Sequence, residues 1–264
     1  MTTERPPLDL VRIALVGVGA GLLSGMFGVG GGILVVPGLV FLAGMEQRMA
    51  HGTSLAAVLP ISVSSLFTYW AQSNVDWPVA LWLSIGAVVG AVLGTRLLHV
   101  VSHRALALGF SALLVVTAVR LFSQSSGGGR TTLTVVSAIV LVAIGLATGT
   151  LAGLLGVGGG VVMVPAMMLA LSLPPSLAKG TSVAVIIPTS IMGTLRNRRN
   201  NNTDLRAAAV VGLGGVGFAV VGGWLSTVMS DRTSNVLFAA LLVTVAARLL
   251  WQVRSESPTG SAEV

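Results

Sequence analysis

Long apolar stretches separated by short polar segments dominate the hydropathy pattern of this chain. A transmembrane helix needs about 20 mostly apolar residues. Several stretches approach or reach that length: 10–27, 52–70, 78–98, 105–122, 133–155, 205–229 and 236–251. Two shorter stretches, 33–43 and 161–173, are too short to cross a membrane comfortably. The pattern predicts an all-α integral membrane protein with about 8–10 membrane-embedded helical segments.

The composition indicates the same class of protein. Of 264 residues, 54% are apolar, and only 15 Lys or Arg and 8 Asp or Glu are present, far below the roughly one quarter charged in a soluble domain. The arginines lie between apolar stretches, so the net charge of +7 fits orientation in an anionic membrane. No nucleic-acid partner is expected, because there is no basic face. The absence of cysteine excludes disulfides and thiolate metal sites.

One sequence block occurs twice. GMFGVGGGILVVP starts at Gly25 and GLLGVGGGVVMVP at Gly153, 128 residues further on, and AHGTS at 50–54 is matched at the same offset by AKGTS at 178–182. The chain is therefore predicted to hold a first membrane repeat at 10–122 and a second at 131–251. A flexible polar linker, SQSSGGGR at 123–130, separates them, and a polar C-terminal tail covers 252–264. Many transporters are duplicated in this way and hold the substrate where the copies meet.

The loop charges predict how the two copies are oriented. The loop at 71–77 carries Asp76 and no Lys or Arg, whereas its equivalent at 196–206 carries four arginines. By the positive-inside rule these equivalent loops lie on opposite sides of the membrane, which makes the repeats inverted. Cytoplasmic placement of the arginine loop puts both termini in the cytoplasm. Inversion requires an odd number of crossings per copy, so the short helix after each glycine cluster is either a fifth crossing or part of a re-entrant hairpin.

The glycine clusters predict helix breaks. Non-helical backbone survives at membrane depth only where protein or a water-filled cavity surrounds it. The helix that follows each GVGGG would present free N–H groups at its start, at 31–34 and 159–162, and helix N-termini bind anions. The glycines predicted to bind substrate are Gly30, Gly31, Gly32, Gly158, Gly159 and Gly160.

The GTS triplets are the second predicted element of the site. Thr53 with Ser54, and Thr181 with Ser182, open the next apolar stretch. Their hydroxyls serve either as helix N-caps or as donors to a ligand. His51 and Lys179 hold equivalent positions before the triplets, and both are predicted to bind substrate. Lys179, the only lysine in the sequence, either supplies charge to an anion or marks a loop end at the membrane surface.

Glycine stripes and prolines predict packing and bends. Small residues four apart at 17, 21 and 25, and at 86, 90 and 94, let helices approach closely in lipid and imply no chemistry. Prolines within the apolar stretches, which predict kinks for packing or for gating, are Pro37, Pro60, Pro165 and Pro188.

Enzymatic chemistry is not expected. All eight acidic residues fall in loops or termini, and three histidines without cysteine form no catalytic or metal-binding pattern. The glycines lack the strand, turn and ribose-binding acid of a dinucleotide site. No cofactor and no metal are predicted.

The doubled pairing of GxxGVGGGxxxVP with a downstream (H/K)GTS resembles the sulfite exporter TauE/SafE family, over nearly the whole chain. The resemblance implies a multi-span transporter of the cytoplasmic membrane that moves sulfite, sulfoacetate or another small sulfur-containing or organic anion. The family's motif falls on Gly28, 30–32, Pro37 and 52–54 in the first copy and on Gly156, 158–160, Pro165 and 180–182 in the second.

The sequence therefore predicts an exporter of a small anion such as sulfite or an organosulfonate, working by alternating access around a central site between the repeats. An anion channel and a non-transporting membrane scaffold are the alternatives. The expected partners are the anion and the lipid bilayer, and the sequence is compatible with a homo-oligomer.

Overall fold

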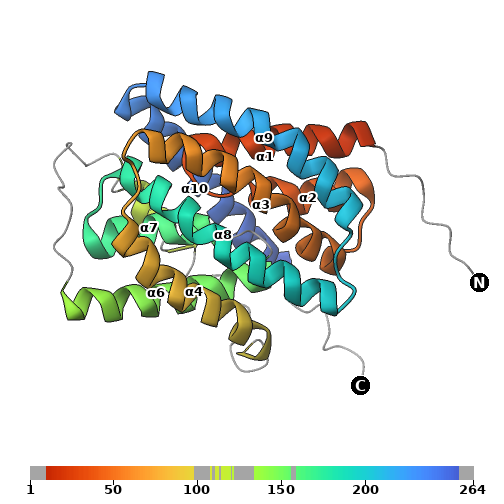
Figure 1. Cartoon of the computed structure of the whole chain (residues 1–264), viewed down its shortest axis with the longest axis horizontal. Coiled ribbons are helices and arrows are strands. Elements are labelled where there is room, and N and C mark those ends of the chain that lie inside the picture. The colour runs from red at the N-terminus through yellow and green to blue at the C-terminus, as the bar shows by residue number, and fades with distance from the viewer. Residues whose placement is uncertain are drawn as a thin grey trace, which may run out of the picture.

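The chain folds into a bundle of α-helices (Figure 1). The computed structural model describes residues 10–97, 108, 111–112, 114–119, 121, 134–155 and 159–255. The helices within those residues are α1 (Leu10–Phe27), α2 (Gly32–Ala43), α3 (Gln47–Ala71), α4 (Trp77–Leu97), α6 (Val135–Leu155), α7 (Gly160–Leu171), α8 (Pro175–Arg199), α9 (Leu205–Val228) and α10 (Asp231–Ser255).

The helices follow the apolar stretches closely, with differences where polar residues are helical. α3 begins at Gln47 and α8 at Pro175, so each GTS triplet lies in the second turn of its helix and the predicted N-cap role is wrong. α8 corresponds to no predicted long stretch, because hydroxyls and three arginines dilute its apolar character. α10 continues to Ser255, so the start of the predicted tail is helical. The 123–130 linker and eight of the eighteen residues at 105–122 lie outside the described residues.

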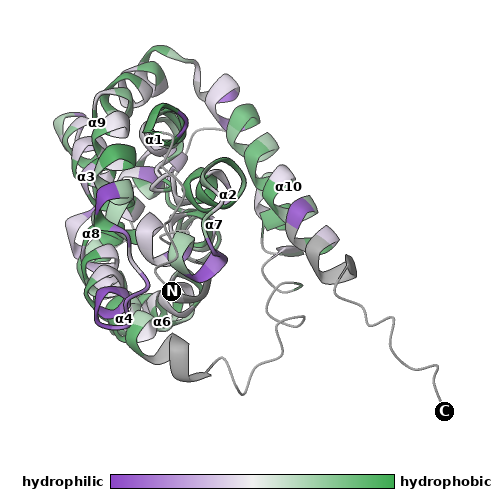
Figure 2. Ribbon diagram, turned by 90° about the vertical axis from the view of Figure 1, so that its right-hand side faces the viewer, coloured by the Kyte–Doolittle hydropathy of each residue, from purple (hydrophilic) through white to green (hydrophobic). Residues whose placement is uncertain are grey.

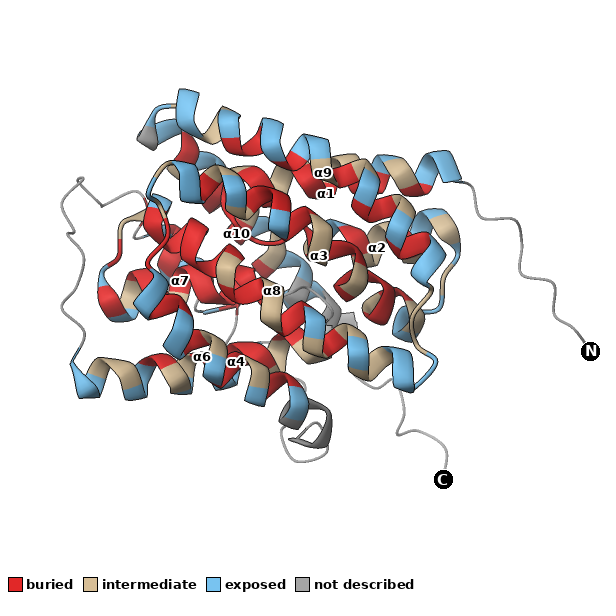
Figure 3. Cartoon of the chain, viewed as in Figure 1, coloured by how far each residue is buried: buried red, intermediate tan, exposed pale blue. Residues whose placement is uncertain are grey.

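The surface of the bundle is apolar, as a lipid-facing surface must be. Within the described residues, four helices are long and apolar enough to cross a membrane: α1, α3, α6 and α9. Large side chains face outward, including Val135 (78% exposed), Phe41 (77%) and Leu213 (74%). Apolar residues line all the helices (Figure 2), and buried positions concentrate in the middle of the bundle (Figure 3). This combination confirms an all-α membrane protein.

Glycines hold two helix pairs at backbone contact. A Cβ at Gly17, Gly21 or Gly25 of α1 would overlap a backbone carbonyl oxygen of α9, and a Cβ at Gly86 or Gly90 of α4 would overlap one of α6. The predicted packing stripes are thereby confirmed at these five positions. In lipid, such close approach provides van der Waals contact between helices that have no hydrophobic drive to associate.

The equivalent helices α3 and α8 lie side by side (Figure 1) and run in opposite directions. Gly52 near the start of α3 lies against Asn197 and Asn202 at the end of α8 and beyond, while Gly180 near the start of α8 lies against Tyr69 and Asn74. The same contact therefore occurs twice, once at each end of the helix pair, and the two copies interlock through it.

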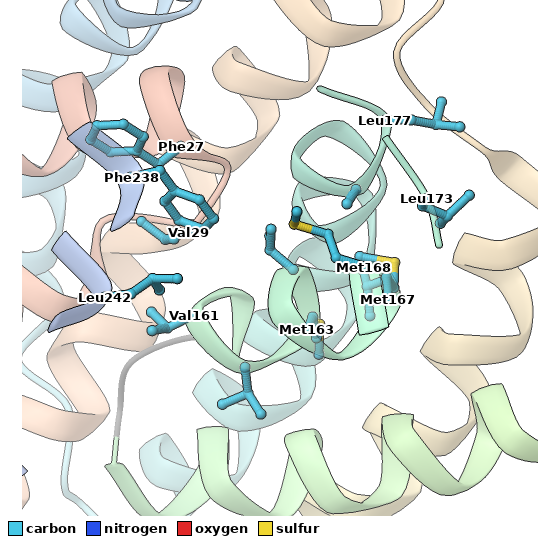
Figure 4. Packing of buried hydrophobic residues seen from close by; sticks show 14 of the residues in the cluster. Phe27, Val29, Val161, Met163, Met167, Met168, Leu173, Leu177, Phe238 and Leu242 are labelled. Carbon is cyan, nitrogen blue, oxygen red and sulfur yellow. The ribbon is translucent and has the colours of Figure 1, made fainter. Parts of the chain in front are cut away.

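The buried core gathers around α7. Nine of its twelve residues are buried, and α10 stands on the side of α2 and α7 that faces away from α3 and α9 (Figure 2). Phe238 and Leu242 of α10 pack toward Phe27 and Val161 (Figure 4). α7 is therefore enclosed by longer helices, whereas α2 has only three buried residues and exposes Phe41.

Candidate functional site

The glycine clusters break the helices where the sequence predicts it. Gly28, Gly30 and Gly31 have φ of 67°, 77° and 72°, and Gly159 has φ of 75°. L-residues with side chains rarely adopt these left-handed angles, so the backbone turns here only because the residues are glycine. α2 begins directly after Gly31 and α7 directly after Gly159, and neither start has a side-chain cap. Gly158 lies outside the described residues.

The breaks of the two copies are in contact. A Cβ at Gly160 would lie 2.9 Å from the Gly28 carbonyl oxygen and 2.9 Å from Cα of Val29. A Cβ at Gly30 would lie 3.0 Å from Cδ1 of Ile186 and 3.2 Å from Cγ1 of Val58. These last two residues are equivalent in the two copies, one on α8 and one on α3. Two helix N-termini from different copies thus start at one place in the molecule.

Fewer backbone donors are left at the two helix starts than the sequence predicts. The N–H of Leu34 donates to the Gly31 carbonyl at 3.0 Å, and that of Val162 donates to the Gly159 carbonyl at 3.0 Å. The last N–H of each predicted set is therefore occupied. The other three N–H groups of each set, at 31–33 and 159–161, have no intrahelical acceptor.

The threonines of the GTS triplets join the two copies. The Asp204 N–H donates to Oγ1 of Thr53 at 2.9 Å, and the Asp76 N–H donates to Oγ1 of Thr181 at 2.9 Å. Both threonines are completely buried. Their hydroxyl oxygens thus satisfy buried backbone donors at the starts of α9 and α4, a structural role that the sequence analysis missed.

Ser182 is positioned on the glycine break of the other copy. Its Oγ lies 2.5 Å from the Gly28 carbonyl oxygen and 2.8 Å from that of Lys179, and its single proton is donated to one of them at a time. Ser182 therefore holds the turn that precedes α2. Its equivalent, Ser54, is also fully buried.

Lys179 is the buried cation of the site. Its side chain is 2% exposed, and Nζ donates to Oγ of Ser234 at 2.8 Å. Nζ also lies 5.6 Å from the ring centroid of Phe27 and 5.3 Å from that of Phe238, within the range of cation–π attraction. The two rings stack on each other at 5.6 Å and point toward one another in Figure 4.

The surroundings of Lys179 connect it to the break. Its carbonyl would overlap a Cβ at Gly28, so the residue abuts the first glycine cluster. The alternative that Lys179 marks a loop end at the surface is wrong, because the side chain is buried within α8. His51, its equivalent, is only half-buried on α3. Phe27, Phe238 and Ser234 were missed by the sequence analysis, since no local pattern relates α1 and α10 to α8.

The four prolines lie inside helices that continue through them. Pro37 is in α2, Pro60 in α3, Pro165 in α7 and Pro188 in α8. Pro60 packs on α9, where a Cβ at Gly212 would lie 2.6 Å from its Cγ. A packing role is therefore visible for one proline, and gating by the four stays a prediction.

No metal-binding cluster of three or more His, Asp or Glu is found in the part of the chain that the structure describes. The acidic residues within it stand at helix starts: Glu46 before α3, Asp76 before α4, Asp204 before α9 and Asp231 as the first residue of α10. The glycine breaks thus carry one cation and backbone donors, a set suited to an anion.

Comparison with known proteins gives one consistent result. The family model described as sulfite exporter TauE/SafE matches residues 13–143 and again residues 140–263. The chain is 26% identical to the "Probable membrane transporter protein YunE" of Bacillus subtilis, over 93% of this chain and 98% of the relative. It is 28% identical to a "Probable membrane transporter protein" of Xylella fastidiosa strain 9a5c, over 96% and 97%.

A third relative matches a shorter part of the chain. The chain is 30% identical to the "Probable membrane transporter protein MJ0441" of Methanocaldococcus jannaschii, over 71% of this chain and 72% of the relative. No solved structure matches the chain.

Proposed function

Because the chain belongs to the sulfite exporter TauE/SafE family, we propose that this membrane transporter carries a small anion, such as sulfite or an organosulfonate, out across the cell membrane. The observation that supports this most is the contact between the glycine breaks of the two copies, where a Cβ at Gly160 would lie 2.9 Å from the Gly28 carbonyl. Two helix N-termini that start at one place present backbone donors to a negative charge.

Lys179 supplies the positive charge. A cation held at 2% exposure beside two stacked aromatic rings is shielded from water and salt, so its attraction for an anion is stronger than that of a surface lysine. Ser182 holds the break in the conformation that exposes the donors. In this proposal the anion contacts the starts of α2 and α7, and Lys179 draws it there.

Transport proceeds by alternating access between inverted copies. The opposite directions of α3 and α8, which are equivalent in sequence, support inversion, and so does the contrast between the arginine loop at 196–206 and the loop at 71–77. The copies rock about the contact between α3 and α8, so that the central site opens to each side in turn. With the arginine loop in the cytoplasm, both termini lie there as well.

The test is flux into proteoliposomes that contain the purified chain. Radiolabelled sulfite and sulfoacetate are expected to cross at a saturable rate, with liposomes lacking protein as the control. A failure to move any of sulfite, sulfoacetate, sulfate, thiosulfate and taurine would contradict the proposal and favour a scaffold. Steady single-channel conductance of the same anions in planar bilayers would favour a channel over alternating access.

A further inference from the structure

Two buried hydroxyls in equivalent positions have no hydrogen-bond partner. Ser62 of α3 and Ser190 of α8 are both 0% exposed, and the Oγ of each is unpartnered. Of the unpartnered buried hydroxyls in the described part of the chain, which also include Ser111, Thr194 and Thr203, only these two are related by the repeat. A buried donor without an acceptor costs stability, so its occurrence in both copies points to a ligand.

The contacts between α3 and α8 place these serines where the helices cross. Leu55 packs against Gly193, where a Cβ would lie 2.8 Å from its Cδ1, and Tyr69 lies against Gly180 at the other end. The antiparallel register fixed by these contacts brings residues 60–62 of α3 opposite residues 187–189 of α8. The two hydroxyls therefore lie near the middle of the helix pair, one from each copy.

The helical faces that carry the serines also face the glycine breaks. Val58 and Ile186 are the side chains that would meet a Cβ at Gly30. Ser62 and Ser190 each follow one of them by four residues, which places them on the same face one turn further along the helix. Because α3 and α8 are antiparallel, Ser62 lies level with Ile186 and Ser190 lies level with Val58, so each hydroxyl stands beside the side chain of the other copy that meets Gly30.

A local carbonyl would normally satisfy a serine inside a helix. Ser65 shows this alternative in the same helix, because its Oγ donates to the Ile61 carbonyl at 3.1 Å. Ser62 and Ser190 make no such bond. Their protons are therefore available to an acceptor that enters between the copies.

We propose that Ser62 and Ser190 donate hydrogen bonds to the transported anion, one from each copy, so that an oxyanion such as a sulfite or sulfonate group bridges the two copies through separate oxygens. This inference rests on the proposed transport function. Neutral donors also bind without holding the anion so tightly that release is slow.

The test separates binding from stability. The full chain is purified in detergent, and calorimetry measures binding of sulfite and sulfoacetate to the wild type, Ser62→Ala, Ser190→Ala and the double variant. Each single change should raise Kd about tenfold, and the double variant should raise it further. Thermal unfolding without anion should show variants as stable as the wild type or more stable, because an unsatisfied hydroxyl has been removed.

Ser64→Ala is the matched control. Ser64 lies on the same helix and is nearly buried (9% exposed), but its Oγ donates to the Val216 carbonyl of α9 at 2.8 Å. Its removal should lower the unfolding temperature and leave Kd unchanged. If the wild type binds and the double variant binds equally well, the serine assignment is wrong and the proposed function stands. If the wild type binds no anion, both fail.

Discussion

The two copies are alike at the contact between α3 and α8 and differ at the proposed anion site. At both ends of the α3 and α8 pair a buried threonine accepts an aspartate N–H at 2.9 Å, and a glycine allows an asparagine carbonyl to approach its backbone. We call these two contacts the clamp. It consists of Gly52 and Thr53 at one end and of Gly180 and Thr181 at the other, and it is the same in both copies. The scaffold is therefore symmetric at the contact about which the copies are proposed to move.

The copies differ at the residue that precedes the glycine of the clamp, which is His51 in the first copy and Lys179 in the second. Lys179 is buried beside Phe27 and Phe238, whereas His51 at the equivalent position is half-buried, and the sequence equivalent of Phe27 is Leu155. A buried lysine thus occupies this position in one copy only. Under the proposed function, the scaffold is shared while the charge that attracts the anion, and with it any directionality, is placed on one copy.

The largest expected effect comes from breaking the symmetric clamp. Gly52→Ala and Gly180→Ala place a Cβ on the carbonyl oxygens of Asn202 and Asn74. A backbone carbonyl cannot rotate away from the clash as a flexible side chain can. Each change should lower the free energy of unfolding by about 3 kcal/mol or more, by similar amounts in the two copies. Denaturant titration in detergent measures this.

Gly217→Ala serves as the control for the clamp. A Cβ there meets nothing within 4 Å, so the change should leave stability unaltered or raise it by about 0.5–1 kcal/mol through helix propensity. Strongly unequal losses at Gly52 and Gly180 would show that the clamp is not symmetric.

Lys179→Met should remove the chemical difference between the copies. Methionine packs well beside aromatic rings, so the protein should fold, while loss of the cation should weaken sulfite binding about 30-fold. His51→Leu should change Kd by less than about threefold, because no comparable buried charge is lost. Calorimetry on both variants tests this, and equal effects at the two positions would contradict a one-sided site.

Thr53→Val and Thr181→Val each remove one hydrogen bond from the clamp, and we expect a smaller loss of stability than from the glycine changes. Valine has the same shape but cannot accept, so the N–H of Asp204 or Asp76 loses its partner. Each variant should lose about 1.5 kcal/mol of stability, with Thr→Ser at the same positions restoring most of it. Unchanged stability in either valine variant would mean that the threonine oxygen is dispensable.

Ser182→Ala should have the smallest effect on stability. The Gly28 carbonyl loses the Ser182 donor, and an under-satisfied carbonyl is tolerated better than an N–H without an acceptor. We expect the free energy of unfolding to fall by about 1 kcal/mol. Anion binding should also weaken, because the turn at Gly28 is held less firmly. Thermal unfolding and calorimetry report the two effects, and unchanged binding would separate Ser182 from the site.

Much of the fold follows from hydropathy, because helices such as α1 and α9 are long, apolar and bounded by polar residues. Periodic glycines likewise predict the close packing of α1. α8 was expected after its GTS triplet but not as a long apolar stretch, because its hydroxyls and arginines reduce its hydropathy, although burial and interlocking with α3 stabilise it. The early starts of α3 and α8 were missed because polar residues form their first turns.

The candidate site was only partly predictable. Glycine clusters reveal a break without tertiary information, because their backbone freedom is a local property. The partners of Lys179 and the bonds made by Thr53 and Thr181 join residues from distant parts of the chain. No local pattern encodes those contacts, and the unpartnered state of Ser62 and Ser190 appears only once burial is known.

The most direct measurement is the side of the membrane on which the two equivalent loops lie. The chain has no cysteine, so Ser73→Cys after α3 and Asn200→Cys after α8, both at exposed positions, each introduce a single thiol. A membrane-impermeant maleimide added to intact cells should label the cysteine at position 73 and leave that at position 200 unlabelled until the cells are opened. Labelling of both from the same side would contradict inverted copies around one anion site.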